Sequence, residues 1–192
     1  RLGTDHLDLW VVHGYSPTAP RDETLSALDA AVASGRTRYV GVALESGWQL
    51  GWTVAHQQGW PGRATPVAVQ AEYSLLRRQV EDEVVPAALD LVLGLVAVSS
   101  LGDVSRAFEA TGGASPHLGP FVKPYLDGWA RGIVEAVATA ADGLALSPLE
   151  VALAWVRDRP GVSSALVGAR TAAQLRGVLA VESVRLPAEI VS

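Results

Sequence analysis

Short apolar runs alternate with amphipathic segments along most of the chain. Residues 7–12 form a mostly apolar run of strand length, which predicts a buried strand. Residues 22–35 then begin with two carboxylates, place apolar side chains at helical spacing and end at Gly35, which predicts a helix with a glycine stop. The same succession of strand and helix recurs down the chain. Right-handed βαβ units and a parallel sheet are therefore predicted.

The pattern predicts the remaining elements by the same reasoning. Strands are expected at residues 7–12, 37–42, 67–70, 95–99 and 163–167, and helices at residues 22–35, 46–59, 81–90, 129–142, 147–160 and from 171 onward. The last two helices each begin with a capping-box spacing, Ser147 with Glu150 and Thr171 with Gln174. Residues 100–127 form a long loop rich in Gly and Pro, a kind of connection that is often functional.

Two α/β architectures fit this order of elements in a single domain, residues 1–192. One is an open, doubly wound sheet of about five strands. The other is part of an eight-stranded (β/α) barrel, since a whole barrel needs roughly 250 residues. Periodicity does not choose between them. The absence of Met and the start just before a strand favour the barrel fragment.

Composition excludes several classes of function. With no Cys, the chain can form no disulfide scaffold, thiolate zinc site or cysteine nucleophile. A formal net charge of -5 argues against a broad basic face for nucleic acid. No two of the four His residues are four apart, so no metal site is predicted. The sequence shows neither a bilayer-spanning run nor a signal peptide, and we expect a cytoplasmic protein without a membrane partner.

Polar residues at predicted strand ends are the candidates for chemistry. His13 follows the first strand, where an imidazole could donate a hydrogen bond to a substrate oxygen or could simply be a surface loop residue. Gln70 and Glu72 end the third strand, where an amide could orient a ligand or tether a loop. Both readings stay open at each position.

A second candidate lies after the last predicted strand. Residues 168–171 lead into a helix N-terminus, where free backbone N–H groups and the helix dipole favour an anion, and Arg170 could add a bidentate contact to phosphate. A plain helix cap is the alternative. Three tryptophans on or beside the second helix are interpreted as packing residues rather than a ligand shelf: Trp48, Trp52 and Trp60.

Four stretches, in this order and spacing, resemble the aldo-keto reductase family. They are LGTDHLDL at residues 2–9 running into His13, RYVGV at 38–42, VQAEYSLL at 69–76, and VGART at 167–171 followed by QL at 174–175. The resemblance covers nearly the whole chain. It implies a (β/α)₈ TIM barrel, here an incomplete barrel of about five parallel strands with outer helices. It also implies that the chain is the family's C-terminal part, beginning just before the fourth barrel strand.

The resemblance implies an NADP(H)-dependent oxidoreductase that reduces aldehydes or ketones, with a small-molecule carbonyl compound as its substrate. His13 matches the catalytic His that orients the substrate carbonyl. The implied cofactor-binding residues are Gln70 at the nicotinamide carboxamide, Ser99 and Leu101 near the pyrophosphate, and Gly168, Arg170 and Gln174 at the adenosine 2′-phosphate side. The sequence carries no signal for an oligomeric state.

Several positions depart from the family pattern. The family's catalytic Asp, Tyr and Lys lie on or after its first three strands, so the chain alone is expected to be inactive. Ala43 and Leu44 replace the usual Ser-Asn pair, and Val98 replaces a common aromatic residue. These departures favour an alternative, a truncated and catalytically inactive relative with residual NADP(H) binding or a regulatory role. An unrelated open α/β binding module is a third hypothesis.

Overall fold

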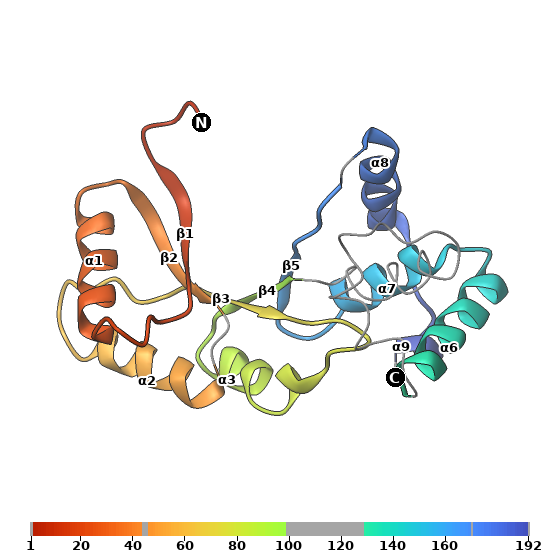
Figure 1. Cartoon of the computed structure of the whole chain (residues 1–192), viewed down its shortest axis with the longest axis horizontal. Coiled ribbons are helices and arrows are strands. Elements are labelled where there is room, and N and C mark those ends of the chain that lie inside the picture. The colour runs from red at the N-terminus through yellow and green to blue at the C-terminus, as the bar shows by residue number, and fades with distance from the viewer. Residues whose placement is uncertain (1, 44–45, 99–128, 170, 192) are drawn as a thin grey trace. The chain divides into compact units, whose positions relative to one another are not determined.

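The computed structural model describes residues 2–43, 46–98, 129–169 and 171–191 (Figure 1). The strands are β1 (Leu7–His13), β2 (Thr37–Ala43), β3 (Ala68–Glu72), β4 (Gly94–Val98) and β5 (Val162–Ala165). The helices are α1 (Arg21–Ala33), α2 (Gly47–Gln58), α3 (Val84–Asp90), α6 (Trp129–Leu144), α7 (Pro148–Arg157), α8 (Ala172–Ala180) and α9 (Ala188–Val191), with 3₁₀ turns η1 (Gln79–Glu81) and η3 (Val181–Ser183). Every predicted strand and helix therefore has a counterpart among the described residues.

The strand order decides between the two predicted architectures. The five strands are parallel and pair in the order of the sequence, β1-β2-β3-β4-β5. A doubly wound sheet reverses its strand order at a switch point, whereas the strands of a (β/α) barrel follow one another around the sheet. The sequential order confirms the prediction of an open, five-stranded part of a barrel-type sheet, and α6 and α7 lie in the described part of the chain between β4 and β5.

The chain divides into two compact units, which are described separately. One consists of residues 1–71 and 79–96, and the other of residues 72–78 and 97–192. The first unit holds β1, β2 and the helices α1 to α3. The second holds α6 to α9 and β5. Whether the 192 residues act as one domain stays a prediction.

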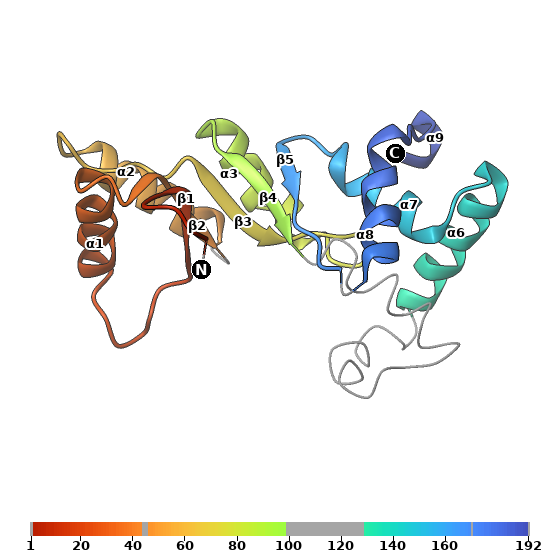
Figure 2. The same cartoon turned by 90° about the horizontal axis from the view of Figure 1, so that it is seen from above.

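In the first unit, one face of the β1–β2 pair packs against α1 (Figures 1 and 2). Leu25 and Leu28 of α1 form a buried cluster with Val40 of β2, and Val12 of β1 packs against it. Side chains alternate between the two faces of a strand, so the neighbours of these residues point the other way. Tyr39, for example, is 57% exposed. The face opposite α1 is the one that carries His13.

The end of α1 confirms the predicted glycine stop. Gly35 has a φ of 72°, a left-handed conformation that glycine adopts without a Cβ clash. Its N–H donates to the carbonyl of Val32, and the N–H of Arg36 donates to the carbonyl of Ala31. These two bonds satisfy carbonyls that would otherwise be left unpaired at the helix end.

The second unit is built around α7. All six residues from Val151 to Val156 are buried, as expected for a helix surrounded by protein. The Trp155 ring packs edge-on against Tyr73 at 5.7 Å, and the guanidinium carbons of Arg159 and Arg78 lie 4.3 and 5.1 Å from its centroid. Aromatic contacts of this kind stabilise a core beyond the area that they bury.

The predicted helix at residues 81–90 is shorter in the structure. It begins at Val84, and residues 79–81 form the separate turn η1. Pro86 explains the late start, because proline is tolerated in the first turn of a helix, where its missing N–H has no intrahelical acceptor, and not further inside.

The part of the chain that the structure describes contains no single helix long and apolar enough to cross a membrane. By length and composition only, α6 and α7 together pass the test as a pair bent by 100°.

Candidate active site

Three residues form a row across the carboxyl ends of neighbouring strands. His13 of β1 pairs in register with Ala43 of β2, and Ala43 pairs in register with Gln70 of β3. Residues paired in a parallel sheet point to the same face, so the three side chains lie side by side on the face opposite α1. The carboxyl ends of strands form the active-site edge of parallel α/β folds. The structure therefore brings His13 and Gln70, two predicted site residues, to one edge.

The two polar side chains of this row have free hydrogen-bonding capacity. His13 is exposed and Gln70 is half-buried, and neither side chain bonds to another described residue. Ala43, between them, is completely buried. An imidazole and an amide can each donate and accept a hydrogen bond, so the row can hold a ligand with carbonyl or amide groups. The carboxylate of Glu72, at the end of β3, forms an ion pair in which its Oε2 lies 3.9 Å from Arg77 Nε.

The predicted capping box at α8 is present. The N–H of Gln174 donates to Thr171 Oγ1 at 3.1 Å, and the N–H of Thr171 donates to Gln174 Oε1 at 3.2 Å. The capping box provides acceptors for the N–H groups of Thr171 and Gln174. The N–H groups of Ala172 and Ala173, in the first turn of the helix, have no acceptor within the helix. The amide oxygen of Gln174 thus has a structural role, and its predicted cofactor contact stays a prediction.

Gly168 lies just before this helix and is exposed. Its φ is outside the left-handed region, and a Cβ added to it would meet nothing within 4 Å. Neither backbone strain nor packing requires glycine here. Close approach of a ligand to the backbone is a remaining reason for a glycine at this position. Three other predicted cofactor residues lie outside the described residues: Ser99, Leu101 and Arg170.

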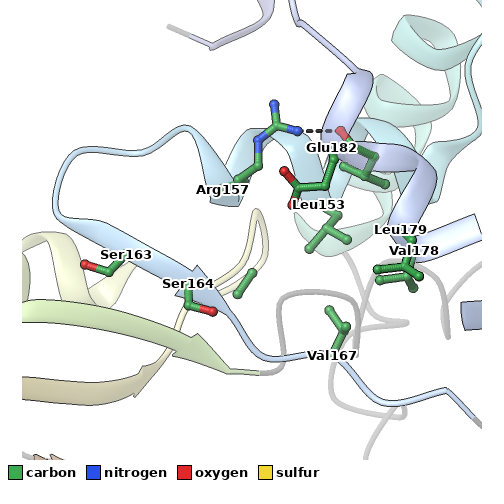
Figure 3. Close-up of a pocket in the computed structure, with 10 residues that line it drawn as sticks. Leu153, Arg157, Ser163, Ser164, Val167, Val178, Leu179 and Glu182 are labelled. Atoms are coloured by element: carbon green, nitrogen blue, oxygen red, sulfur yellow. Dashed lines mark hydrogen bonds between the residues drawn. The ribbon is translucent and has the colours of Figure 1, made fainter.

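A pocket of about 320 Å³ lies among α7, β5, α8 and η3 (Figure 3). Ser164 contributes a hydroxyl group and Glu182 a carboxylate, beside apolar side chains such as Leu153 and Val178, whereas the hydroxyl of Ser163 points away from them (Figure 3). Arg157 also lines it, but its guanidinium is largely engaged. It donates to both carboxylate oxygens of the adjacent aspartate at 2.7 Å and to two backbone carbonyls of η3 and the residue that follows. The pocket therefore offers little free positive charge.

The ion pair beside this pocket shifts the pKa of both partners. The hydrogen bonds from Arg157 lower the pKa of Asp158, and burial opposes this only in part. The same hydrogen bonds raise the pKa of Arg157. Both groups are therefore held in their charged forms. The side chains are 18% and 37% exposed, so the solvent screens the pair.

The interpretation of the tryptophans as packing residues is wrong for at least two of them. Trp48 and Trp60 are 64% and 61% exposed, and Trp52 is 38% exposed. Trp48 and Trp52 lie one helical turn apart at the start of α2, where they reach the side chain of Arg21 on α1. Trp48 and Trp52 are four residues apart, which places them on one face of a helix. This spacing was the signal in the sequence that could have indicated a contact shared by the two rings.

Among the residues that the structure describes, no group of three or more His, Asp or Glu side chains is arranged to hold a metal ion.

The sequential parallel sheet, with its polar row at the carboxyl edge, defines a (β/α)-barrel type of protein. Comparison with family models gives a match to the aldo/keto reductase family over residues 1–192. The chain belongs to the aldo/keto reductase family, and its fold class is that of the family.

Similar proteins come from bacteria and fungi. An uncharacterized oxidoreductase of Bacillus subtilis, YrpG, is 32% identical over 196 residues, which cover 99% of this chain and 58% of the relative. The B. subtilis aldo-keto reductase YhdN is 26% identical, over 93% of this chain and 54% of the relative. The versiconal hemiacetal acetate reductase of Aspergillus parasiticus is 26% identical, over 98% and 56%. The chain thus spans a little over half the length of these curated relatives.

Proposed function

We propose that this chain is the part of an NADP(H)-dependent reductase of aldehydes or ketones that holds the substrate carbonyl and much of the cofactor. The row of His13, Ala43 and Gln70 at the carboxyl edge is the observation that carries the proposal. It supplies two polar side chains that bond to no other described residue, side by side, in a member of a family of oxidoreductases.

In this proposal each polar member of the row has one role. An N–H of the His13 imidazole donates to the carbonyl oxygen of the substrate and holds it in place, which favours the developing negative charge on that oxygen. The Gln70 amide holds the nicotinamide carboxamide by pairing donor with acceptor and acceptor with donor. The cofactor, when bound, supplies the hydride. In the proposal, the proton for the alcohol comes from the family's catalytic Tyr, which has no counterpart among the residues matched to the family above.

The phosphate end of the cofactor is assigned to the region around α8. Gly168 allows close approach of the backbone, and the N–H groups of Ala172 and Ala173 lie at a helix N-terminus, which favours anions. In the proposal, Arg170 pairs with the 2′-phosphate and Gln174 borders the adenosine, while Ser99 and Leu101 line the pyrophosphate. The described residues of this region fit such a group.

A second function is favoured by two apolar residues at positions that the family resemblance assigns to the nicotinamide end. Ala43 is a buried methyl group between the two polar members of the row, and β4 ends at Val98, which has no aromatic face. Neither can hydrogen-bond to a carboxamide or stack on a nicotinamide ring. The alternative proposal is a catalytically inactive relative that keeps weak NADP(H) binding for regulation.

The test uses the full-length protein encoded by the gene. NADPH oxidation is followed with an aldehyde as substrate, in wild type and in His13→Ala. We expect the variant to lose about 10²- to 10³-fold in kcat/KM, the usual cost of removing one hydrogen-bond donor to a developing oxyanion, with NADPH affinity unchanged. His6→Ala, just before the same strand, is the matched control and should keep its activity. NADPH binding without any carbonyl reduction would establish the alternative instead.

A further inference from the structure

Arg21, the first residue of α1, is surrounded by aromatic rings. Its guanidinium carbon lies 5.1 Å from the ring centroid of Tyr15, 5.3 Å from that of Trp48 and 5.4 Å from that of Trp52. Three aromatic rings within this distance attract the cation and hold it in one place. They offer no strong acceptor for its five N–H groups.

No charge partner for Arg21 is found among the described residues. It forms no ion pair or hydrogen bond with any of them. The adjacent carboxylate of Asp22 is directed elsewhere, since its Oδ1 lies 3.1 Å from His56 Nε2. A half-buried guanidinium without an anionic neighbour is a ready binding group for a carboxylate or a phosphate.

The same guanidinium lines a cavity of about 430 Å³ next to the candidate active site. Gly14, which directly follows His13, lines the cavity, as do Tyr15 and Gln49. The oxygen of the Gln49 amide already accepts from the N–H and the hydroxyl of Ser46, both at 3.2 Å. Its NH₂ group has no partner among the described residues and is a second donor for an anion.

From this geometry we infer that Arg21 binds the carboxylate of the carbonyl substrate, so that the preferred substrates are oxo acids, aldehydes or ketones that carry a carboxylate. The inference rests on the proposed function for the carbonyl end. A singly charged carboxylate matches one guanidinium and one amide. A phosphate carries about two negative charges at neutral pH, of which the one guanidinium among the described residues that line this cavity balances only one.

The first experiment measures binding. The full-length protein with NADP⁺ is titrated by calorimetry with 4-oxobutanoate, which carries a carboxylate, and with butanal, an uncharged aldehyde of the same chain length. Wild type should bind 4-oxobutanoate about 10- to 100-fold more tightly, as a charge-assisted hydrogen bond predicts. Equal affinity for the two aldehydes would overturn the inference. Tighter binding of a phosphate-bearing aldehyde than of 4-oxobutanoate would refute the carboxylate and show that the site prefers a phosphate.

Variants then test Arg21 directly. Arg21→Gln should abolish the preference for 4-oxobutanoate, and Arg21→Lys, which keeps the charge but loses the forked donors, should retain part of it. The Lys variant also serves if the Gln variant fails to fold. Arg36→Gln is the matched control, because it removes the same charge from an exposed residue just beyond the other end of α1. Equal losses in Arg21→Gln and Arg36→Gln would show a general charge effect and refute the site.

Turnover separates this inference from the proposed function. The ratio of kcat/KM for 4-oxobutanoate to that for butanal should fall in Arg21→Gln and stay constant in Arg36→Gln. Binding of 4-oxobutanoate that depends on Arg21, without reduction of either aldehyde, would support the anion site and refute the proposed reductase function. Reduction of both aldehydes at equal kcat/KM would support the proposed reductase function and refute the anion site.

Discussion

His13 of β1 and Gln70 of β3 lie in one row of the sheet, and Ala43 of β2, the strand between them, is in register with both. Ala43 is completely buried, and its methyl group occupies the position between the two polar side chains. Ala43→Ser adds a hydroxyl at this point. If the nicotinamide carboxamide lies over the row, we expect the variant of the full-length protein to bind NADPH about 2- to 12-fold more tightly, the value of one net hydrogen bond.

Ala68→Ser is the matched control for this gain. Ala68 is also nearly buried and lies on the same face of the sheet, paired with Gly41 and further from the carboxyl edge. Its hydroxyl should leave the NADPH affinity unchanged. Calorimetric titration of both variants provides the comparison. A similar change in the two variants would place the carboxamide away from this row.

The second prediction concerns cofactor choice. Arg170→Ala should weaken NADPH binding by roughly 10- to 150-fold and NADH binding much less, because only NADPH carries the 2′-phosphate that a guanidinium can pair with. Arg176→Ala, on the exposed side of α8, removes the same charge nearby and should have a small effect on both cofactors. Calorimetric titration of each of the two variants with NADPH and with NADH tests this prediction. Equal losses for NADPH and NADH in Arg170→Ala would refute the assignment of the 2′-phosphate.

The third prediction uses two glycines of one helix. A Cβ at Gly47, the first residue of α2, would lie 2.8 Å from both the Cβ and the carbonyl oxygen of Glu83. Gly47→Ala should therefore lower the free energy of unfolding by about 1–3 kcal/mol, the usual cost of overpacking. Gly51→Ala, with nothing within 4 Å of the added Cβ, should raise it by about 0.5–1 kcal/mol through helix propensity. Urea unfolding of both variants tests the opposite signs.

The fourth prediction is a pH dependence at Asp158. Its pKa is lowered in the folded protein, so the folded state binds the proton less tightly than the unfolded chain. The stabilisation is therefore present above the ordinary aspartate pKa of about 3.9 and is lost as pH falls through the lowered value. Asp158→Asn should cost at most about 1 kcal/mol at neutral pH, because the pair is partly exposed, and progressively less in acid.

Urea unfolding of wild type and Asp158→Asn at a series of pH values measures this difference. High salt should reduce it at neutral pH, since the partly exposed pair is screened. A difference that stayed constant from neutral pH down to acid would show that Asp158 stabilises the fold by packing and not through its charge.

The sequence predicted most of the elements because their signals are local. The glycine stop of α1 and the capping boxes at Ser147 and Thr171 depend on residues within three or four positions of one another. Apolar periodicity is local as well. The start of α3 was predicted too early because the limit that Pro86 places on the first turn is a finer signal than the apolar pattern.

The sequence by itself determined the order of elements, the family and the strand ends that carry His13 and Gln70. Only the tertiary structure decided the order of the strands, which separates a barrel-type sheet from a doubly wound one. It also decided which residues of neighbouring strands share a row, and that Arg21 lies among three aromatic rings. The physical reason is the same in each case. Register and side-chain contacts depend on residues distant in the sequence, brought together by burial of apolar surface, which is not directional and leaves no local pattern in the chain.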